Sequence, residues 1–454
     1  MSNVRVLKFG GTSVGAPERM RQVARLISAD EQTKIVVLSA LSGTTNSLVS
    51  IGKSWKNLRP IEVNQQVETL YDHYLNFIND LLSQQREEGK AVIDKHFDQI
   101  KRLTAVSFNR SSNRELLAQG ELMSTKLFFL YLKENSMKAM LIPALEMVSM
   151  DENGEPDIDL IADRLNSLLE ANTDQSVFIT QGYICRNHLG EIDNLKRGGS
   201  DYTASLLGAA VRAEAVEIWT DIDGMHNNDP RIVPNTYPIE ALSFDEAAEL
   251  AYFGAKILHP NTIWPAQKYN IPVKLLNTMA PQARGTVVSS ARNPGSIKAI
   301  AAKDGIIAIK IKSSRMLLAY GFMTKVFEIF EHFKVSIDMI TTSEVAVSLT
   351  IDDDEHLSSL VEALKEYGEV AVDKNLTIVC IVGDLISEER GLVKHVFRGI
   401  GEQPIRMISY GGSRNNISIL IPTTSKTEVL LALNKGLFAP TEVSKGNPGS
   451  LKFH

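Results

Sequence analysis

The sequence predicts an α/β protein in which a mostly parallel sheet, sandwiched between helices, is followed by two small β-α-β-β-α-β modules. Up to about residue 291, short apolar runs alternate with segments of helical periodicity, which is the order expected of a parallel sheet with helices on both faces. The polar segment Arg292–Ser296 is typical of a linker, and beyond it the alternation changes to the pattern of the small modules. We therefore expect a first domain over residues 1–291 and a second region that holds both modules.

Composition and charge narrow the possible functions. The chain has 454 residues and a formal net charge of −6, which argues mildly against a nucleic-acid surface. No apolar run approaches ~18 residues and the chain starts almost directly with a strand, so we expect no membrane span and no signal peptide. Cys185 and Cys380 lie far apart in apolar runs and are expected to be buried thiols of a cytoplasmic protein. No Cys or His spacing typical of a metal site occurs.

The first strand ends in a motif suited to phosphate. It carries a lysine near its end and runs into two glycines and two hydroxyl residues, after which Pro17 begins a helix. Glycines let the backbone approach an anion, N–H groups and hydroxyls donate to its oxygens, and the lysine adds charge. A tight turn with a solvated lysine explains the same residues. The motif is not a P-loop, because Ala16-Pro17 stands where Lys-Ser/Thr is required, and no protein-kinase signature is present. The expected cradle consists of Lys8, Gly10, Gly11, Thr12 and Ser13.

Ile35–Ala40 is predicted to be the next strand. It is apolar throughout, as expected of a strand buried on both faces of a parallel sheet, and a hydroxyl-rich loop, Ser39–Asn46, follows at its carboxyl end. In open α/β sheets this is the edge where ligands bind. An ordinary turn with a helix cap at Thr44 or Thr45 also explains the loop.

The middle of the first domain is predicted to be largely helical. Residues 62–105 are typical of a helical pair, and the following helix carries Gly120 and Glu121 among apolar residues. A carboxylate beside a glycine on such a helix can hold a substrate ammonium group, although a surface glutamate is the plainer interpretation. Ala139–Met150 is then predicted as a strand, Pro156 as the start of a helix, and Ser176–Ile184 as a further buried strand.

A second glycine-rich loop, Lys196–Thr203, leads into an alanine-rich helix. The N–H groups and the dipole at a helix start favour anions, and Arg197 can grip a carboxylate with two hydrogen bonds. Ser200 or Asp201 can instead serve only as the helix cap.

The rest of the first domain contributes two more strands, Val216–Asp221 and Ile271–Leu276. Between them Ser243–Glu246 forms a capping box that predicts a helix start. Lys256 follows near the end of that helix, where a lysine commonly complements the helix dipole in solvent.

Beyond residue 296 the periodicity predicts one complete module and one that lacks a clear final strand. The complete module covers residues 303–374, and the incomplete one covers residues 375–440. Ile297–Ala302 is a spare strand just before the first copy. We expect it to complete the second copy, so that residues 296–302 and 375–440 form one module into which the other is inserted.

Several motifs, in order, resemble those of the aspartate kinases of the amino-acid kinase family: Lys8–Ser13, Gly120–Ser124, Arg197–Asp201 and Phe253–Pro260. The resemblance implies the amino-acid kinase fold and the reaction of ATP with L-aspartate to give 4-phospho-L-aspartate and ADP. It also implies Mg²⁺ bound mainly through ATP, without a metal site of the protein itself. In this sequence Gln119 stands where the family usually has His, and His226 where many relatives have Tyr near the adenine.

The resemblance also assigns roles to single residues. Lys8 would stabilise charge on the transferring phosphoryl group, and Asp201 would orient Lys8. Glu121 would bind the ammonium group of the substrate and Arg197 its α-carboxylate. Ser39, Thr45 and Ser200 would complete the substrate site. Besides the phosphate cradle, the residues expected to contact the nucleotide are Thr220, Asp221, His226, Arg231, Lys256 and Ile257.

The paired modules resemble ACT domains, which bind regulatory amino acids. The segment Ser336–Glu344 resembles the effector site of lysine-inhibited aspartate kinases, in which Asp338 would pair with an ammonium group. A turn residue at a strand end is the other interpretation of Asp338. ACT domains usually pair edge to edge, so a homodimer or a higher assembly is expected. The expected effector residues are Met316, Gly321, Phe322, Met323, Ile337, Asp338, Thr342, Ser343 and Glu344.

Two other functions are kept open. A kinase of the same superfamily that acts on glutamate or carbamate would share the Lys-Gly-Gly opening, but would not be expected to combine Glu121, Arg197 and paired ACT modules. A non-catalytic amino-acid sensor would use only the last third of the chain, and its phosphate motifs should be decayed, whereas these look intact. From the length we expect no fused homoserine dehydrogenase.

Overall fold

The computed structural model describes residues 4–195, 198–254, 258–292, 297–313, 320–384 and 392–438. These divide into two compact units. The first contains the described residues up to 225 and residues 238–292, and the second contains residues 226–237 and those from 297 onwards. Within the described residues, no helix has the length and apolar character needed to span a membrane.

The first unit is built on an eight-stranded sheet in the order β3-β4-β2-β1-β7-β9-β10-β8. Neighbours from β3 to β9 are parallel, and β10 turns antiparallel to β9, so the prediction of a mostly parallel sheet is confirmed. The strands are β1 (Val4–Phe9), β2 (Thr33–Leu38), β3 (Met140–Leu141), β4 (Val177–Gln181), β7 (Ala215–Thr220), β8 (Ala241–Ser243), β9 (Val273–Asn277) and β10 (Thr286–Ser289), with a separate hairpin of β5 (Ile184–Arg186) and β6 (Ile192–Asn194).

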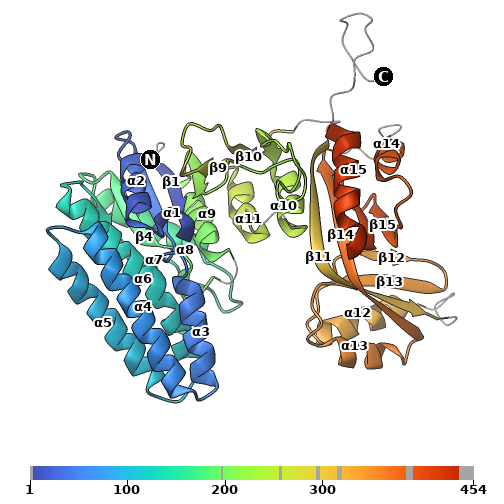
Figure 1. The fold of residues 1–454 in the computed structure, drawn as a ribbon, viewed down its shortest axis with the longest axis horizontal. Helices are drawn as coiled ribbons and strands as arrows, with labels where there is room; N and C mark the ends of the chain where they lie inside the picture. The colour runs from blue at the N-terminus through green and yellow to red at the C-terminus, as the bar shows by residue number, and fades with distance from the viewer. Residues whose placement is uncertain are drawn as a thin grey trace, which may run out of the picture. The chain divides into compact units, whose positions relative to one another are not determined.

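Helices cover this sheet. Four long ones, α3 to α6, lie side by side (Figure 1) and contact one another along their lengths. The helices are α1 (Gly11–Val14), α2 (Pro17–Ile27), α3 (Thr44–Lys56), α4 (Pro60–Leu81), α5 (Arg86–Thr104), α6 (Arg110–Glu134), α7 (Ala144–Met147), α8 (Ile158–Ala171), α9 (Gly199–Val211), α10 (Phe244–Tyr252) and α11 (Pro260–Tyr269).

Successive side chains of β1 point to opposite faces of the sheet, and this alternation decides on which face Lys8 lies. Leu7 and Phe9 are buried in the core shared with helices α2 to α6. The intervening residues face α9, which lies so close that a Cβ on its Gly208 would come 2.4 Å from the Cγ2 of Val216 on β7. Lys8 therefore points toward the α9 side of the sheet.

Two predictions for the first unit are wrong in detail. Ala139–Met150 is not one strand, because Pro143 interrupts it after β3 and α7 follows. Ser176–Ile184 divides into β4 and β5, because Tyr183 takes a positive φ of 68° between them. The capping box at Ser243 is confirmed, with Ser243 and Glu246 bonding each other's backbone N–H groups.

The second unit contains an antiparallel six-stranded sheet in the order β12-β13-β11-β14-β16-β15. Helices α12 and α13 lie against one half of it and α14 and α15 against the other (Figure 1). The elements are β11 (Ile297–Lys312), α12 (Phe322–His332), β12 (Ile340–Thr342), β13 (Ala346–Ile351), α13 (Leu357–Leu364), β14 (Glu369–Gly383), α14 (Leu392–Ile400), β15 (Met407–Tyr410), β16 (Asn416–Pro422) and α15 (Lys426–Phe438).

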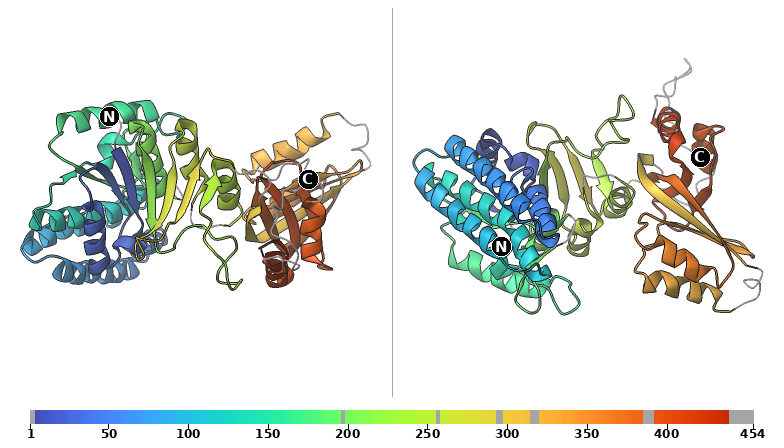
Figure 2. Two further views of the ribbon diagram at one scale, coloured as in Figure 1. Left: turned by 90° about the horizontal axis from the view of Figure 1, so that it is seen from above. Right: turned by 60° about the horizontal axis from the view of Figure 1, so that its bottom comes forward.

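Strands β11 and β14 are long because each runs through both modules (Figure 2). Residues 297–306 of β11 pair with residues 376–383 of β14, and residues 308–312 pair with 369–373. The spare strand predicted from the sequence therefore lies in the first half of β11. It pairs with residues 376–383 of β14, which form the first strand of the second module. Gly305 and Asn375, both with positive φ, lie where one half passes into the other.

The second unit also takes in a segment that the sequence analysis placed in the first domain. Residues 226–237 pack with α14, α15 and the sheet, with Val233 fully buried in the apolar core of that half. The Asn228 side chain donates to the carbonyl of Leu430 at 3.4 Å, and the N–H of Ile300 donates to the Asn227 carbonyl at 2.9 Å.

Candidate active site

A pocket of about 710 Å³ opens at the carboxyl ends of β1, β2 and β4. This is the edge where parallel sheets bind ligands. It brings together six of the predicted catalytic and substrate residues, namely Lys8, Ser39, Thr45, Glu121, Ser200 and Asp201, with Gly11 and Thr12 of the predicted phosphate cradle.

Lys8 and Asp201 form an ion pair in this pocket. The Lys8 Nζ lies 2.6 Å from the Asp201 Oδ1, and both side chains are largely buried. Lys8 comes from the end of β1 and points to the α9 side, where Asp201 stands in the first turn of that helix. The alternation along β1 and the start of α9 at Gly199 thus place the two charges together.

Glu121 is buried at the same pocket, only 3% exposed on α6. Its Oε1 accepts a hydrogen bond from the Ala40 N–H at 3.2 Å, while its Oε2 is buried without a hydrogen-bond partner among the described residues. Burial raises the pKa of Glu121 to about 7, against the opposing effects of the Ala40 N–H and the Lys8 charge. A cationic ligand group would stabilise its charged form and take the open acceptor.

Two longer helices begin at the pocket. α3 starts after Gly43 and α9 after Gly198, and both glycines take a positive φ, of 84° and 76° respectively. A glycine cannot cap the helix with a side chain, so first-turn N–H groups remain available to a ligand. Together with Lys8 they make this wall of the pocket suited to anions.

Sequence reasoning missed several residues that line the pocket: Ala40, Leu41, Ser42, Gly43, Asn46, Tyr183, Gly198 and Gly199. Most of them belong to the two loops that the sequence analysis predicted, in which only some residues were given a role. Tyr183 is different, because only its position just past a strand end could have indicated it. Burial, and then the charge of Glu121, raises the pKa of Tyr183 to about 12, so its hydroxyl stays protonated and can donate.

Two residues of the predicted phosphate cradle do not line the pocket. Ser13 is fully buried, and its Oγ lies 2.8 Å from the Thr278 Oγ1 and 3.3 Å from the Trp219 carbonyl oxygen. The Gly10 N–H also donates to that carbonyl, at 3.3 Å. Both residues therefore anchor the loop to the neighbouring strands, and their contact with the nucleotide stays a prediction.

The residues expected at the nucleotide are distributed over both units. Thr220 ends β7, which lies beside β1, and Asp221 follows it, with the Thr220 Oγ1 donating to the Asp221 Oδ1 at 3.1 Å. His226 and Arg231 belong to the second unit, where the His226 Nδ1 is 2.8 Å from the Thr236 Oγ1 and the Arg231 Nη2 is 2.7 Å from the Asp229 Oδ2. Arg197, Lys256 and Ile257 lie outside the described residues.

The expected effector site already contains a cation. The buried Asp338 carboxylate lies 2.8 Å from the Lys303 Nζ, which is also 2.9 Å from Asp352. Burial lowers the pKa of Lys303, but its hydrogen bonds to the two carboxylates outweigh this and raise it. Met316 lies outside the described residues, and the other expected members in this module are Gly321, Phe322, Met323, Ile337, Thr342, Ser343 and Glu344.

Among the described residues, no group of three or more His, Cys, Asp or Glu side chains is arranged to hold a metal ion.

Comparison with known proteins gives two family matches. Residues 3–277 match the amino acid kinase family, and residues 379–437 match the ACT domain. The chain is 34% identical to the lysine-sensitive aspartokinase 3 of Escherichia coli (strain K12), over 96% of this chain and 100% of that protein. The crystal structure of E. coli aspartokinase III with aspartate and ADP superposes with a TM-score of 0.85, and its complex with lysine and aspartate with 0.79, each covering 96% of this chain and 100% of that chain at 34% identity.

Proposed function

The chain belongs to the amino acid kinase family and, within it, to the aspartokinases, and from this premise we propose that it transfers the γ-phosphoryl group of ATP to the side-chain carboxylate of L-aspartate. The products are 4-phospho-L-aspartate and ADP. The observation that carries the proposal is a single pocket in which the Lys8–Asp201 ion pair and the buried Glu121 meet.

The reaction needs alignment and charge neutralisation more than covalent chemistry by the protein. An oxygen of the aspartate side chain forms the new bond to the γ-phosphorus, and the bond to the bridging oxygen breaks as ADP leaves. Lys8 would stabilise the negative charge on the transferring group, held in place by Asp201. The helix starts at α3 and α9 supply further N–H donors near that charge.

The substrate would be oriented by its two α-groups. Its ammonium would meet the open Oε2 of Glu121, and Arg197 would take its α-carboxylate. Ser39, Thr45 and Ser200 would complete this site. For the nucleotide we retain as the proposed contacts Lys8, Gly10, Gly11, Thr12, Ser13, Thr220, Asp221, His226, Arg231, Lys256 and Ile257.

Mg²⁺ is proposed to enter with ATP, held by its phosphates and by water, and to supply further charge neutralisation. The pocket residues fit this arrangement, because Asp201 is paired with Lys8 and the unpartnered Oε2 of Glu121 is the proposed acceptor for the substrate ammonium. Neither carboxylate is then required as a metal ligand.

Feedback regulation by an amino acid belongs to the same proposal, with lysine as the effector in the first ACT module. Asp338 would bind its ammonium group, in a module proposed to span residues 303–374. The second module would comprise residues 296–302 and 375–440, and the catalytic domain residues 1–291. Cys185 and Cys380 are buried and form no disulfide, which supports a reducing, cytoplasmic location.

The test is acyl phosphate formation from ATP, Mg²⁺ and L-aspartate, trapped with hydroxylamine, with and without L-lysine. Product that decreases with lysine supports both the activity and the effector. Product indifferent to lysine retains the enzyme and rejects lysine as the effector. Product from glutamate but not aspartate would move the protein to another kinase of the superfamily, and no product from either would favour a sensor.

A further inference from the structure

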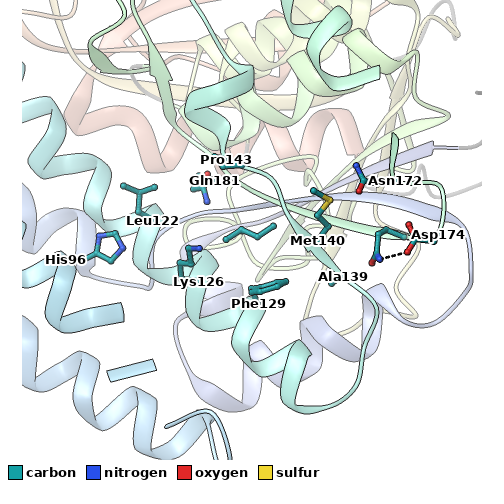
Figure 3. Close-up of a pocket in the computed structure, with 12 residues that line it drawn as sticks. His96, Leu122, Lys126, Phe129, Ala139, Met140, Pro143, Asn172, Asp174 and Gln181 are labelled. Carbon is teal, nitrogen blue, oxygen red and sulfur yellow. Dashed lines mark hydrogen bonds between the residues drawn. The ribbon is translucent and has the colours of Figure 1, made fainter. Parts of the chain in front are cut away.

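A second cavity, of about 570 Å³, lies in the first unit and shares no lining residue with the active-site pocket. It sits at the edge of the main sheet, where β3 pairs with β4 on one side and no other described strand pairs on its outer side. Figure 3 shows Leu122, Lys126 and Phe129 of α6 on one side of the space, with Met140 and Asn172 across from them. Its volume is typical of small-molecule sites.

Helix α6 presents different residues to the two cavities. Residues 122, 126 and 129 follow the spacing of one helix face and line the second cavity. Glu121 lines the active-site pocket instead. Thr125 links the two regions, because its Oγ1 donates to the Glu121 carbonyl at 2.8 Å and accepts from the Nε2 of Gln181, which lines the second cavity, at 2.9 Å.

The walls are mainly apolar and the principal charge is a lysine. Leu122, Phe129, Met140 and Leu141 are all half-buried, so their apolar atoms border the cavity without being sealed in the core. No carboxylate of the described residues forms an ion pair with Lys126. Across the cavity, Asp174 already accepts from the Nε2 of Gln175 at 3.0 Å.

Among the described residues, the other basic side chain that lines the cavity is His96, which offers an acceptor rather than a charge. Its Nδ1 lies 2.7 Å from the Gln119 Oε1, and the Gln119 Nε2 donates to the Glu115 carbonyl at 3.0 Å. Gln119 therefore accepts the Nδ1–H, which leaves the His96 Nε2 with a lone pair. Burial lowers the pKa of His96 below its ordinary value, so the ring is neutral near pH 7.

From these observations we propose that the cavity beside α6 and β3 is a binding site for a small amphipathic carboxylate, with its apolar body on Phe129 and Met140 and its carboxylate on Lys126. The cavity offers an anion one lysine, with neither a helix start nor a second cation beside it. A phosphate usually takes several donors, so this arrangement suits a monoanion better. The apolar walls supply affinity through burial of the body. Among the described lining residues, a purely cationic ligand would find its counter-charge in Asp174, which already accepts a hydrogen bond from Gln175.

The experiment measures binding of 3-phenylpropionate to the full chain by ligand-observed NMR titration, with saturating L-aspartate and ADP to fill the active site. The neutral 3-phenylpropanol and the cationic 3-phenylpropylamine are titrated alongside. We expect the carboxylate to bind about tenfold more tightly than the alcohol, since a charge-assisted contact contributes roughly that factor. The amine is expected to bind no better than the alcohol.

Variants locate the site. Lys126→Met should abolish the preference for the carboxylate over the alcohol, while Lys133→Met, two turns along the same helix and outside the cavity, should keep it. Ala139→Phe narrows the cavity from the other wall and should weaken all three probes. Equal binding of carboxylate and alcohol, stronger binding of the amine, or an unchanged preference in Lys126→Met would overturn the proposal.

Discussion

At the scale of single residues, the position of the Lys8 ammonium depends on Asp201, 2.6 Å away. We expect Lys8→Ala to lower kcat by about a thousandfold, since one charge contact at ~4 Å is worth at most about 4 kcal/mol at an effective dielectric of ~20. Asp201→Asn should cost less, about tenfold to a hundredfold, because the charge remains but is less well oriented. Steady-state kinetics measures both. A loss below about tenfold for Lys8→Ala would remove it from the central role.

The raised pKa of Glu121 predicts how activity depends on pH. Because the pKa lies at about 7 in the free protein, the carboxylate form that binds an ammonium group predominates only above that pH. We therefore expect kcat/KM for aspartate to rise with pH through about 7 and then level off. Glu121→Gln should raise KM for aspartate at least about tenfold and remove this rise. A rise that persists unchanged in Glu121→Gln would assign it to another group.

The same shift has a consequence for stability. A carboxyl group with a higher pKa in the folded state binds more protons there than in the unfolded chain between the two values. Its contribution should therefore make the protein less stable as the pH rises from about 4.5, the ordinary pKa of the group, to about 7, its pKa in the folded state. Denaturant unfolding across this range should show a smaller decrease in Glu121→Gln than in the unaltered protein. An equal decrease in both would contradict the assignment.

Asp338 can be tested against a neighbour that shares its cation. Asp338 and Asp352 both contact Lys303, but only Asp338 belongs to the expected effector segment. Asp338→Asn should raise the lysine concentration for half-inhibition by about tenfold or more while preserving kcat without lysine. Asp352→Asn, the matched control, should change it little. Equal shifts in both variants would mean that the Lys303 ion pairs, and not the effector contact, are responsible.

Single residues also mark the limit of prediction from sequence. Glu121 and Asp201 could be proposed because each stands in a recognisable glycine-containing motif, and the pocket brings them together. Tyr183 carries no such pattern, and its place follows from a backbone turn with positive φ that local sequence does not specify. Ser13 fits the motif but is used for anchoring, because the strand carrying Trp219 lies next to it in space and far away in sequence.

At the scale of elements, residues 226–237 complete the core of the second ACT half. Val233 is 1% exposed there, so Val233→Asp would bury an uncompensated charge and should lower the free energy of unfolding of the second unit by about 3 kcal/mol or more. Val345→Asp, the same change at a residue of the second unit that is 43% exposed, should cost little. Urea unfolding monitored by far-UV circular dichroism compares the two variants. Similar losses would mean that the docked segment contributes little.

Elements with a strong local signal were predicted well and those set by distant contacts were not. The capping box at Ser243 is purely local and is confirmed. The continuation of the predicted strand Ile297–Ala302 into the first module, as the long strand β11, was missed, because a glycine such as Gly305 commonly marks a turn. Pairing with β14, itself continuous through Asn375, carries the strand through that glycine. The docking of residues 226–237 depends on contacts with α15 that no periodicity could indicate.

At the scale of the whole molecule, the fold class could be predicted because the order of strands and helices changes once, near residue 292. The assembly is a separate prediction. ACT modules that pair edge to edge should give a homodimer, so sedimentation equilibrium at micromolar concentration is expected to report at least twice the 50.1 kDa chain mass. A species of the single-chain mass would contradict pairing.

The packing of residues 226–237 against α15 also affects the order in which the chain can fold during synthesis. Asn228 bonds a carbonyl that lies 202 residues later in the chain. At ~5–20 residues per second, the ribosome needs about 10 to 40 s to make that partner. Throughout this interval the nascent catalytic half carries Ile232 and Val233 without the helix that covers them, together with the unpaired first half of β11. Helix α15 is thus what covers this segment, and chaperones would have the segment to shield until α15 has been made.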